Sequence, residues 1–117
     1  MRDHRKLEAF QLADSLVMRI YAITRQFPVD EKFSLASQLR RSAVSVGANI
    51  VEGSSRSSKA GYLRFLGIAY GSARELEYEL SIATRLGYVK TSAARELEHT
   101  ASRTCRALHG LITALRG

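Results

Sequence analysis

Residues 59–87, KAGYLRFLGIAYGSARELEYELSIATRLG, decide the fold, because they carry the most regular apolar repeat in the chain. Steps of four and three residues alternate through the whole stretch. This spacing puts side chains on one stripe of an α-helix and forms a heptad seam. The stretch therefore predicts a long amphipathic helix with one face turned toward a core. The seam consists of Tyr62, Leu66, Ala69, Ala73, Leu76, Leu80, Ala83 and Gly87.

The same spacing recurs on both sides of this stretch and predicts three more helices. The breaks between helices fall at Pro28, at the Gly-Ser-rich residues 53–58 and at Gly87, which are residue types that end or separate helices. The predicted stripes are Leu7, Phe10, Ala13, Val17, Ile20, Thr24 and Phe27 in the first helix, Leu35, Leu39, Ala43, Val46, Ile50 and Gly53 in the second, and Ala94, Leu97, Ala101, Thr104, Leu108, Leu111 and Leu115 in the fourth.

Local signals predict where the helices begin and end. Phe27 should end the first helix, since a residue before proline is disfavoured in the α region. Ser34 should cap the start of the second helix, and Thr91 or Ser92 the start of the fourth. Gly53 should close the second helix in the left-handed conformation.

Four amphipathic helices without a period-two strand pattern predict an all-α protein. Short connections make sequence neighbours run up and down, so we expect an antiparallel up-down four-helix bundle, with residues 1–117 as a single domain. A chain of 117 residues and 13.0 kDa has room for one hydrophobic core.

Small residues at four-residue spacing predict close helix contacts, either within the chain or with a second copy. Apolar residues beside the seams at positions 65, 68 and 112 widen the stripes and indicate self-association. The small pairs are Ala43 with Gly47, and Gly67 with Gly71.

Charge is the main functional clue. Eighteen Lys and Arg against eleven Asp and Glu give a net charge of +7 and a pI near 10.1, which favours anionic partners. Residues 32–64 hold six basic residues against one acidic, and residues 85–117 hold six against two. The candidate nucleic-acid-binding residues in these two stretches are Arg40, Arg41, Arg56, Lys59, Arg64, Arg95, Arg103 and Arg106.

Residues 54–59, SSRSSK, allow two interpretations. They could hold a phosphate, because a helix start exposes N–H groups and Arg56 and Lys59 add two cations. They could instead be a polar loop in which Ser57 or Ser58 is the N-cap of the next helix.

The acidic residues of the third predicted helix can be interpreted without assigning them a function. Glu75, Glu77 and Glu79 form a run that is typical of a solvated helix face. Arg40 and Arg41 could form surface ion pairs with Glu75 and Glu79 instead of binding phosphate, and such pairs contribute little stability.

No set of residues for catalysis or metal binding is complete in the sequence. Glu96 and His99 form one Glu-x-x-His motif where di-iron bundles need two, and His99 should face solvent because Leu97 holds the core position. Cys105 and His109 lack a third group, so we expect an inert, packed thiol beside a surface histidine. We therefore expect no enzymatic activity, no metal ion and no cofactor.

The sequence also predicts a cytoplasmic protein that does not insert into a membrane. The chain has one cysteine, so it cannot form an intrachain disulfide. Its longest apolar runs are far shorter than the roughly 20 residues that span a bilayer. The charged residues 1–6 are not followed by the apolar segment of a signal peptide.

Two motifs are specific in combination: Gln-Leu-Arg-Arg at residues 38–41 and Asn-Ile-Val-Glu-Gly at residues 49–53. With them the chain resembles the four-helix-bundle proteins encoded in intervening sequences of bacterial 23S rRNA genes. Ser34 departs from that family's pattern, which often has Gly there. The other matching residues are Phe27, Pro28, Glu31, Phe33, Leu35, Ser42, Ala43, Ser45, residues 62–66, Ile68, Ala69, Gly71, Ser72, residues 75–77 and residues 86–88.

The resemblance implies a cytoplasmic bacterial bundle that assembles into a homopentameric ring and has no catalytic residues to carry over. The family includes the accessory variability determinant of diversity-generating retroelements, which works with a reverse transcriptase and RNA. Asn49 and Glu52 can share a helix face and bond to the next loop or to a partner helix. With Gly53 we interpret them as a structural motif rather than as a binding site.

These observations predict a non-enzymatic, oligomeric bundle that binds RNA, or an RNA–protein complex, through arginine-lined surfaces. Aromatic residues are not interleaved with the basic ones, so binding should act on the phosphate backbone and depend on salt. The alternative is an oligomeric interaction scaffold that docks an acidic protein partner.

Overall fold

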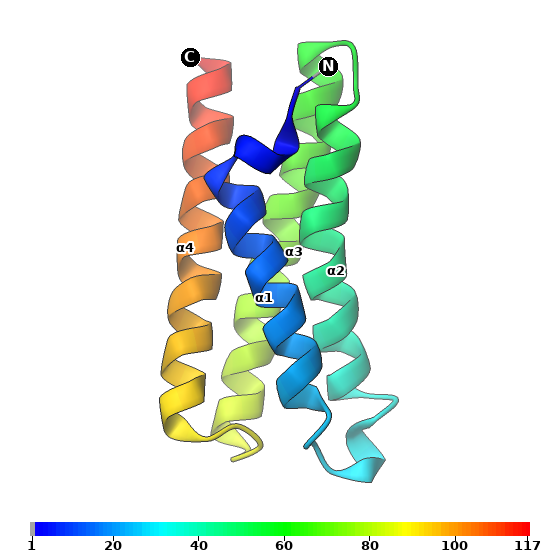
Figure 1. Cartoon of the computed structure of the whole chain (residues 1–117), viewed down its shortest axis with the longest axis vertical. Coiled ribbons are helices and arrows are strands. Elements are labelled where there is room, and N and C mark those ends of the chain that lie inside the picture. The colour runs from blue at the N-terminus through cyan, green and yellow to red at the C-terminus, as the bar shows by residue number, and fades with distance from the viewer. Residues whose placement is uncertain (1) are drawn as a thin grey trace.

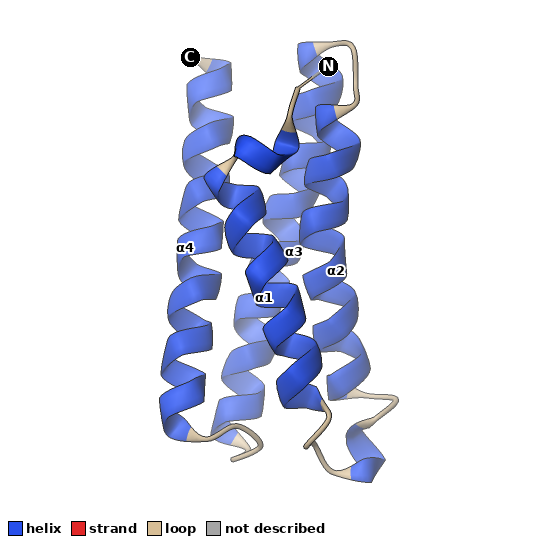
Figure 2. Cartoon of the chain, viewed as in Figure 1, coloured by secondary structure: helices blue, strands red, loops and turns tan. Residues whose placement is uncertain are grey.

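The alternating steps of the sequence become four α-helices in residues 2–117, the part of the chain that the computed structural model describes. Helices and loops account for these residues, and none of them forms a strand (Figure 2). The predicted all-α four-helix bundle is confirmed. The helices are α1 (Glu8–Thr24), α2 (Leu35–Ser54), α3 (Lys59–Arg85) and α4 (Thr91–Arg116), with the 3-10 turns η1 (His4–Lys6) and η2 (Val29–Glu31).

Each helix of the bundle packs against two others. α1 and α3 both contact α2 and α4, whereas the diagonal pairs α1 with α3 and α2 with α4 do not approach each other within residues 2–117. In Figure 1 the colour gradient runs down α1, up α2, down α3 and up α4. Both termini therefore lie at the end that carries the turn between α2 and α3, on a molecule 44 × 23 × 19 Å in extent.

The predicted stripes of α2 and α3 form the centre of the core. All six stripe residues of α2 are buried, and so are all those of α3 except Gly87. The regular repeat predicts these two helices well because apolar or small residues recur at steps of three and four without interruption.

The stripes of α1 and α4 are confirmed in part. In the first stripe Ala13, Ile20, Thr24 and Phe27 are buried as predicted. Leu7, Phe10 and Val17 are only half-buried and pack against the core from its edge, whereas Ala9 and Leu16 are buried although they were not predicted. In α4 the predicted Leu111 and Leu115 are half-buried, and Thr100, Cys105 and Ile112 are buried in addition to the other predicted positions.

Several predicted helix ends are wrong. α1 ends at Thr24, and Phe27 is buried beyond it with its ring 5.3 Å from that of Tyr88. Ser34 precedes α2 as predicted, but its side chain makes no capping bond, and the Leu35 N–H instead donates to Glu31 Oε1 at 3.5 Å. α4 begins at Thr91, and neither Thr91 nor Ser92 caps it, because Lys90 occupies the N-cap position.

Gly53 does not close α2 in the left-handed conformation, because within residues 2–117 only Gly87 has a positive φ. Gly53 instead lies inside α2 and is buried. A Cβ built on it would stand 3.0 Å from Phe65 Cβ and 3.3 Å from the Tyr62 carbonyl oxygen. Its role is therefore to let α2 come close to the first turns of α3.

Gly87 ends α3 as the sequence predicts. Its φ of 78° lies in the left-handed region that favours glycine. The Gly87 N–H donates to the Thr84 carbonyl and the Tyr88 N–H to the Ala83 carbonyl, both at 3.0 Å. These two bonds form a Schellman motif, which satisfies carbonyls that the helix end leaves free.

The predicted close contact at Gly67 and Gly71 does not occur within the chain. Both residues are exposed, and a Cβ added to either would meet no atom within 4 Å. A Cβ added to Gly47 would lie 3.9 Å from Phe10 Cε1, and Ala43 is buried in the core. The small residues of α3 are thus available to a second copy but not used by this one.

Candidate functional site

The structure divides the eight predicted basic residues among three places. Arg40 and Arg41 lie in the first half of α2, and Arg56, Lys59 and Arg64 lie at its other end, around the turn into α3. The remaining residues, Arg95, Arg103 and Arg106, lie along α4. The eight side chains therefore do not form one continuous surface.

Arg40 has partners inside the bundle. Its Nε donates to Thr24 Oγ1 at 2.8 Å, and its guanidinium lies 5.0 Å from the centre of the Tyr21 ring. The side chain joins α2 to α1. Arg41 donates to Ser37 Oγ at 3.2 Å. Within residues 2–117 neither arginine forms the ion pairs with the glutamates of α3 that the sequence allows.

At the turn between α2 and α3 the capping interpretation is confirmed. Ser58 is the N-cap of α3, and its hydroxyl accepts a hydrogen bond from the Gly61 N–H at 3.0 Å. Arg56 pairs with Glu52 at 2.9 Å and lies 4.7 Å from the centre of the Phe65 ring. The serine hydroxyl thus occupies one N–H of the helix start, and Arg56 already has a carboxylate partner.

The amino-terminal arm brings an arginine to the same place, which the sequence analysis missed. The backbone N–H of Arg2 donates to the Ser54 carbonyl at 3.2 Å, and its Nη1 donates to the Arg56 carbonyl at 3.2 Å. Its guanidinium lies 4.2 Å from the centre of the Tyr62 ring. Residues 1–31 are neutral in sum, so charge counting by segment gave no signal for it.

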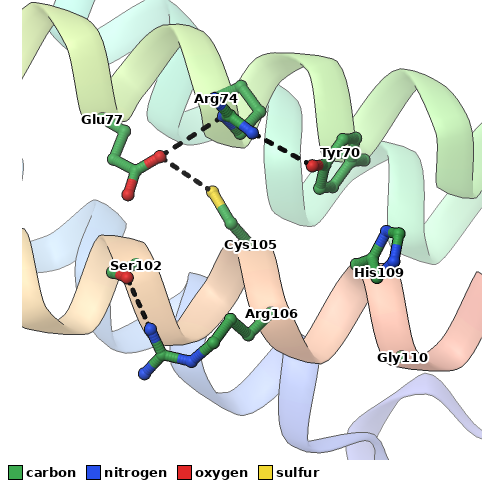
Figure 3. A pocket seen from close by; sticks show the side chains of 8 residues that line it. All are labelled: Tyr70, Arg74, Glu77, Ser102, Cys105, Arg106, His109 and Gly110. Carbon is green, nitrogen blue, oxygen red and sulfur yellow. Dashed lines mark hydrogen bonds and ion pairs between the residues drawn. The ribbon is translucent and has the colours of Figure 1, made fainter.

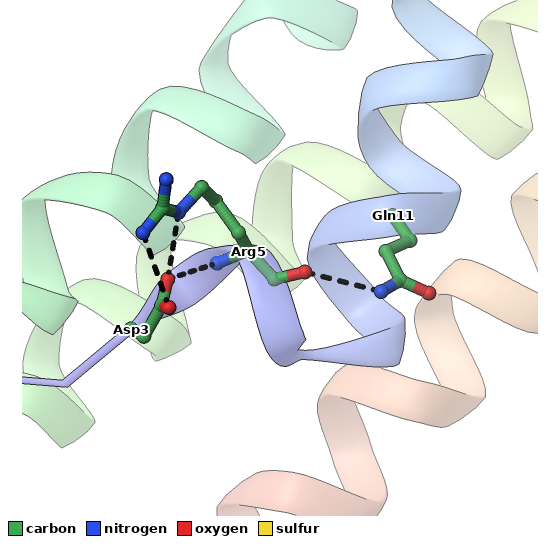
Figure 4. Close-up of polar contacts among 3 residues, drawn as sticks. All are labelled: Asp3, Arg5 and Gln11. Carbon is green, nitrogen blue, oxygen red and sulfur yellow. Dashed lines mark hydrogen bonds and ion pairs between the residues drawn. The ribbon is translucent and has the colours of Figure 1, made fainter.

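Figure 4 shows how the arm is held. Asp3 Oδ1 accepts from the Arg5 N–H at 3.1 Å and from Arg5 Nε at 3.0 Å, and the Arg5 carbonyl accepts from Gln11 Nε2 at 3.1 Å. The hydrogen bonds from Arg5 lower the pKa of the Asp3 carboxyl. The arm is therefore joined to the start of α1.

We call the cations at this end of the bundle the basic end. They come from the amino-terminal arm, the turn between α2 and α3 and the first turns of α3. Within residues 2–117 the structure gives no acidic partner within 4.0 Å for most of them, since only Arg5 and Arg56 are paired. The basic end consists of Arg2, Arg5, Lys6, Arg56, Lys59 and Arg64.

The arginines of α4 differ in their contacts. Arg95 is exposed, and no acidic side chain of residues 2–117 lies within 4.0 Å of it. Arg103 pairs with Glu8 at 3.5 Å and joins α4 to α1. Arg106 donates to Ser102 Oγ at 2.6 Å. His99 is exposed, as predicted.

A groove of about 590 Å³ lies between α3 and α4 (Figure 3). The Cys105 thiol donates to Glu77 Oε1 at 3.6 Å, and Arg74 contacts both Glu77 Oε1 at 3.5 Å and the Tyr70 hydroxyl at 3.2 Å. Burial, followed by the Glu77 charge, raises the pKa of Cys105 to about 12, which agrees with the predicted inert thiol. The lining residues are Tyr70, Arg74, Glu77, Ser102, Cys105, Arg106, His109 and Gly110.

A smaller groove of about 260 Å³ lies on the other side of α3, against α2. The predicted solvated face is wrong for Glu79, which is only 8% exposed because its position on α3 turns it toward α2. Its Oε1 has no hydrogen-bond partner among residues 2–117. Burial raises the pKa of the Glu79 carboxyl, and the nearby Glu75 adds to this. The lining residues are Gln38, Arg41, Ser42, Glu75 and Glu79.

The motif residues have partners within the chain. Asn49 Nδ2 donates to the Ser45 carbonyl at 2.8 Å and to Ser45 Oγ at 3.0 Å. Ser45 Oγ and Ser72 Oγ, 2.8 Å apart, share a hydrogen bond that joins α2 to α3. Glu52 reaches the next loop through Arg56. Asn49 therefore bonds within its own helix, whereas Glu52 bonds to the next loop.

Two negative findings concern residues 2–117. No group of three or more His, Cys, Asp and Glu side chains in this part of the chain is placed to hold a metal ion. None of its helices combines the length and the apolar character needed to cross a membrane.

The chain is similar to known proteins both in sequence and in structure. The model of the 23S rRNA-intervening sequence protein family matches residues 5–110. A crystal structure of a protein of unknown function from the S23 ribosomal protein family of Bacteroides thetaiotaomicron is similar over 90% of this chain and 95% of that one, with 25% sequence identity and a TM-score of 0.82. No protein of curated function matches the chain.

Proposed function

Because the chain belongs to the 23S rRNA-intervening sequence protein family, we propose that it is a non-enzymatic, oligomeric RNA-binding protein of the cytoplasm. It would bind RNA, alone or within an RNA–protein complex, through the basic end. The observation that supports this function is that Arg2, Lys6, Lys59 and Arg64 gather at one end without an acidic partner among residues 2–117. Phosphates of a nucleic acid would supply the missing negative charge.

The basic end suits the phosphate backbone more than the bases. Three of its arginines lie over aromatic rings, Arg2 over Tyr62 and both Arg56 and Arg64 over Phe65, so these rings are covered and do not offer free stacking surfaces. Contacts to phosphate position a protein on RNA but carry no sequence information. We therefore expect binding with steep salt dependence and weak sequence preference.

The test is an RNA titration at several salt concentrations with two matched triple variants. The first, Lys6→Gln, Lys59→Gln and Arg64→Gln, removes three charges from the basic end. Because each phosphate contact to single-stranded RNA contributes about 0.7 to the slope of log affinity against log salt, this variant should lower the slope by about 2.

The control variant removes three charges at the opposite end of the bundle, through Lys32→Gln, Arg85→Gln and Lys90→Gln. It should keep the wild-type slope. Equal losses in both variants would contradict the basic end as the site. Absence of RNA binding by the wild type at low salt would overturn the function and favour an acidic protein partner.

The oligomeric part of the proposal is supported by the outer faces of α2 and α3. Val44, Val51 and Ile68 are 47%, 40% and 43% exposed there, and the open Gly67 and Gly71 flank Ile68. A helix of a second copy could approach closely at these glycines. A homopentameric ring is the form that we propose.

Light scattering behind a sizing column should give several times 13.0 kDa for the wild type. Ile68→Glu should lower that mass, because it places a charge on the proposed contact face. Met18→Glu is the control, since Met18 is 69% exposed on α1, outside that face. A monomeric wild type would refute self-association.

A further inference from the structure

The groove between α3 and α4 combines cations, hydroxyl groups and aromatic rings in a way that neither the family nor the basic end explains (Figure 3). We infer that it binds a nucleotide, with the phosphate between Arg74 and Arg106 and the base against Tyr70 and His109. For a nucleotide within an RNA strand, the inference rests on the proposed function. For a free nucleotide it stands independently.

The size of the groove fits such a ligand. Its volume of about 590 Å³ is roughly twice that of the groove on the other side of α3, about 260 Å³. Sites for small molecules measure roughly 300 to 1,000 Å³. At one end Gly110 has no side chain, and a Cβ there would meet no atom within 4 Å, so that end is open. A phosphorylated nucleoside therefore has room to enter.

The two arginines come from opposite walls of the groove. Arg74 extends from α3 and Arg106 from α4, and both line the groove together with Cys105. Figure 3 shows the Arg106 side chain turned along α4 toward Ser102, and because this side chain is exposed it can rotate toward Arg74. A phosphate in the groove would then accept hydrogen bonds from both, and a planar guanidinium suits such an anion.

Hydroxyl groups orient these arginines without neutralising them. The Tyr70 hydroxyl accepts from Arg74 at 3.2 Å, and the Ser102 hydroxyl accepts from Arg106 at 2.6 Å. Arg106 has no carboxylate within 4.0 Å among residues 2–117, whereas Arg74 shares the groove with Glu77. Each guanidinium carries five N–H donors, so several remain for a ligand.

Glu77 is the one acidic side chain among the lining residues of the groove, and its carboxylate already has two partners. It forms an ion pair with Arg74 at 3.5 Å and accepts a hydrogen bond from the Cys105 thiol at 3.6 Å. With Arg74 and Arg106 positive and Glu77 negative, the charged lining remains positive by one. The groove therefore still attracts a phosphate.

The aromatic end lies about one helical turn from the two arginines. Tyr70 precedes Arg74 by four residues on α3, and His109 follows Arg106 by three on α4, so each aromatic ring shares a helix face with an arginine. The two rings stand 6.0 Å apart at 45° and border the open end. Stacking on such rings contributes about 1–3 kcal/mol per base in proteins that bind unpaired nucleotides.

The experiment is calorimetric titration of the full-length protein with four probes: adenosine 5′-monophosphate, adenosine, inorganic phosphate and a single-stranded oligoadenylate. Adenosine monophosphate should bind at least tenfold more tightly than either adenosine or inorganic phosphate. The double variant Arg74→Gln, Arg106→Gln should lose at least tenfold in affinity. The matched control Arg85→Gln, Arg95→Gln removes one charge from each of the same helices and should keep the wild-type affinity.

The four probes separate the sources of the ligand. If the double variant loses binding of both adenosine monophosphate and oligoadenylate, the groove is supported as a site for unpaired nucleotides of RNA. Loss of the monophosphate alone, with oligoadenylate unbound by the wild type, supports a site for a free nucleotide and counts against the RNA-binding function.

Two results would overturn the inference. In the first, the double variant and its control bind every probe with equal affinity. This result counts against the groove even if the wild type binds oligoadenylate, because the basic end would account for that binding. The other is inorganic phosphate binding as tightly as adenosine monophosphate, because the aromatic end would then contribute nothing. Circular dichroism of both variants shows whether the helices are intact.

Discussion

The two grooves that flank α3 carry opposite charge. The groove toward α2 contains two glutamates and one arginine, whereas the groove toward α4 contains two arginines and one glutamate. Each also holds one buried titratable group whose pKa burial raises, Glu79 on one side and Cys105 on the other. Burial of a group that is neutral at pH 7 is tolerated easily, but burial of a carboxylate opposes folding.

The grooves also differ in size, with about 260 Å³ toward α2 and about 590 Å³ toward α4. A glycine of each partner helix differs in its surroundings as well. A Cβ on Gly53 of α2 would stand 3.0 Å from Phe65 Cβ on α3, whereas a Cβ on Gly110 of α4 would meet no atom within 4 Å. The smaller groove contains the orphaned carboxylate oxygen of Glu79, and the wider groove toward α4 has room for a ligand. Four predictions test this contrast.

The largest effect concerns the thiol of Cys105. With its pKa raised from 9.0 to about 12, the thiolate fraction at pH 8 should fall about a thousandfold relative to the unfolded chain. Labelling by iodoacetamide should therefore be about that much slower in the folded protein than in urea. Because the folded pKa is the higher one, stability should decrease as pH rises from 9 toward 12. Labelling within tenfold of the unfolded rate would contradict this.

The second effect concerns the close approach of α2. Gly53→Ala should destabilise the protein by about 1–3 kcal/mol, because Phe65 Cβ and the Tyr62 carbonyl leave no room for the added methyl. Gly110→Ala, also in a helix interior but facing open space, should stabilise by up to about 1 kcal/mol. Urea unfolding of both variants measures the difference. Similar values for the two would show that α2 is free to shift away.

The third effect concerns the orphaned oxygen of Glu79. Its folded pKa lies above the ordinary value of 4.5, so the penalty is absent below pH 4.5 and fully present above the folded pKa. Glu79→Gln should therefore stabilise the protein by about 1 kcal/mol at pH 7 and by less as pH falls toward 4.5. The exposed Asp14→Asn on α1 is the control. A pH-independent effect of Glu79→Gln would contradict burial as the cause.

The smallest effect belongs to the arginines of the wider groove. Arg74 is largely exposed and its contact with Glu77 is of the surface type, so Arg74→Gln and Arg106→Gln together should change stability by about 0.5 kcal/mol or less. Urea unfolding measures this change. A large loss would mean that the two side chains hold α4 on α3, and it would weaken any conclusion drawn from lost ligand binding.

The fold followed from the sequence where the apolar repeat is regular. The seam from Tyr62 to Ala83 is buried throughout, and the ends of α3 obey their local signals at Ser58 and Gly87. α1 was predicted less well, because Phe10 and Val17 are only half-buried and the unpredicted Ala9 and Leu16 are buried. Periodicity shows that a helix has a face, but neighbouring helices decide which face is covered.

The candidate sites were predicted less well from the sequence than the fold was. Charge counting selected Arg56 and Lys59 but missed Arg2, whose position depends on where the amino-terminal arm folds back. The sequence also suggested that Glu79 is solvated. The rotation of α3 about its own axis decides whether this side chain faces solvent or α2, and in the structure it faces α2. The wider groove had only Cys105 and His109 as a sequence signal, since its other wall comes from α3.

The sequence by itself determined four amphipathic helices, where they break and how much positive charge they carry, because helix formation and its periodicity depend on residues within a few positions of one another. Only the tertiary structure decided how closely the helices approach, which side chains meet across the two grooves and which cations remain without partners. Those properties depend on contacts between residues far apart in the chain, such as Tyr70 with His109, and no local pattern encodes them.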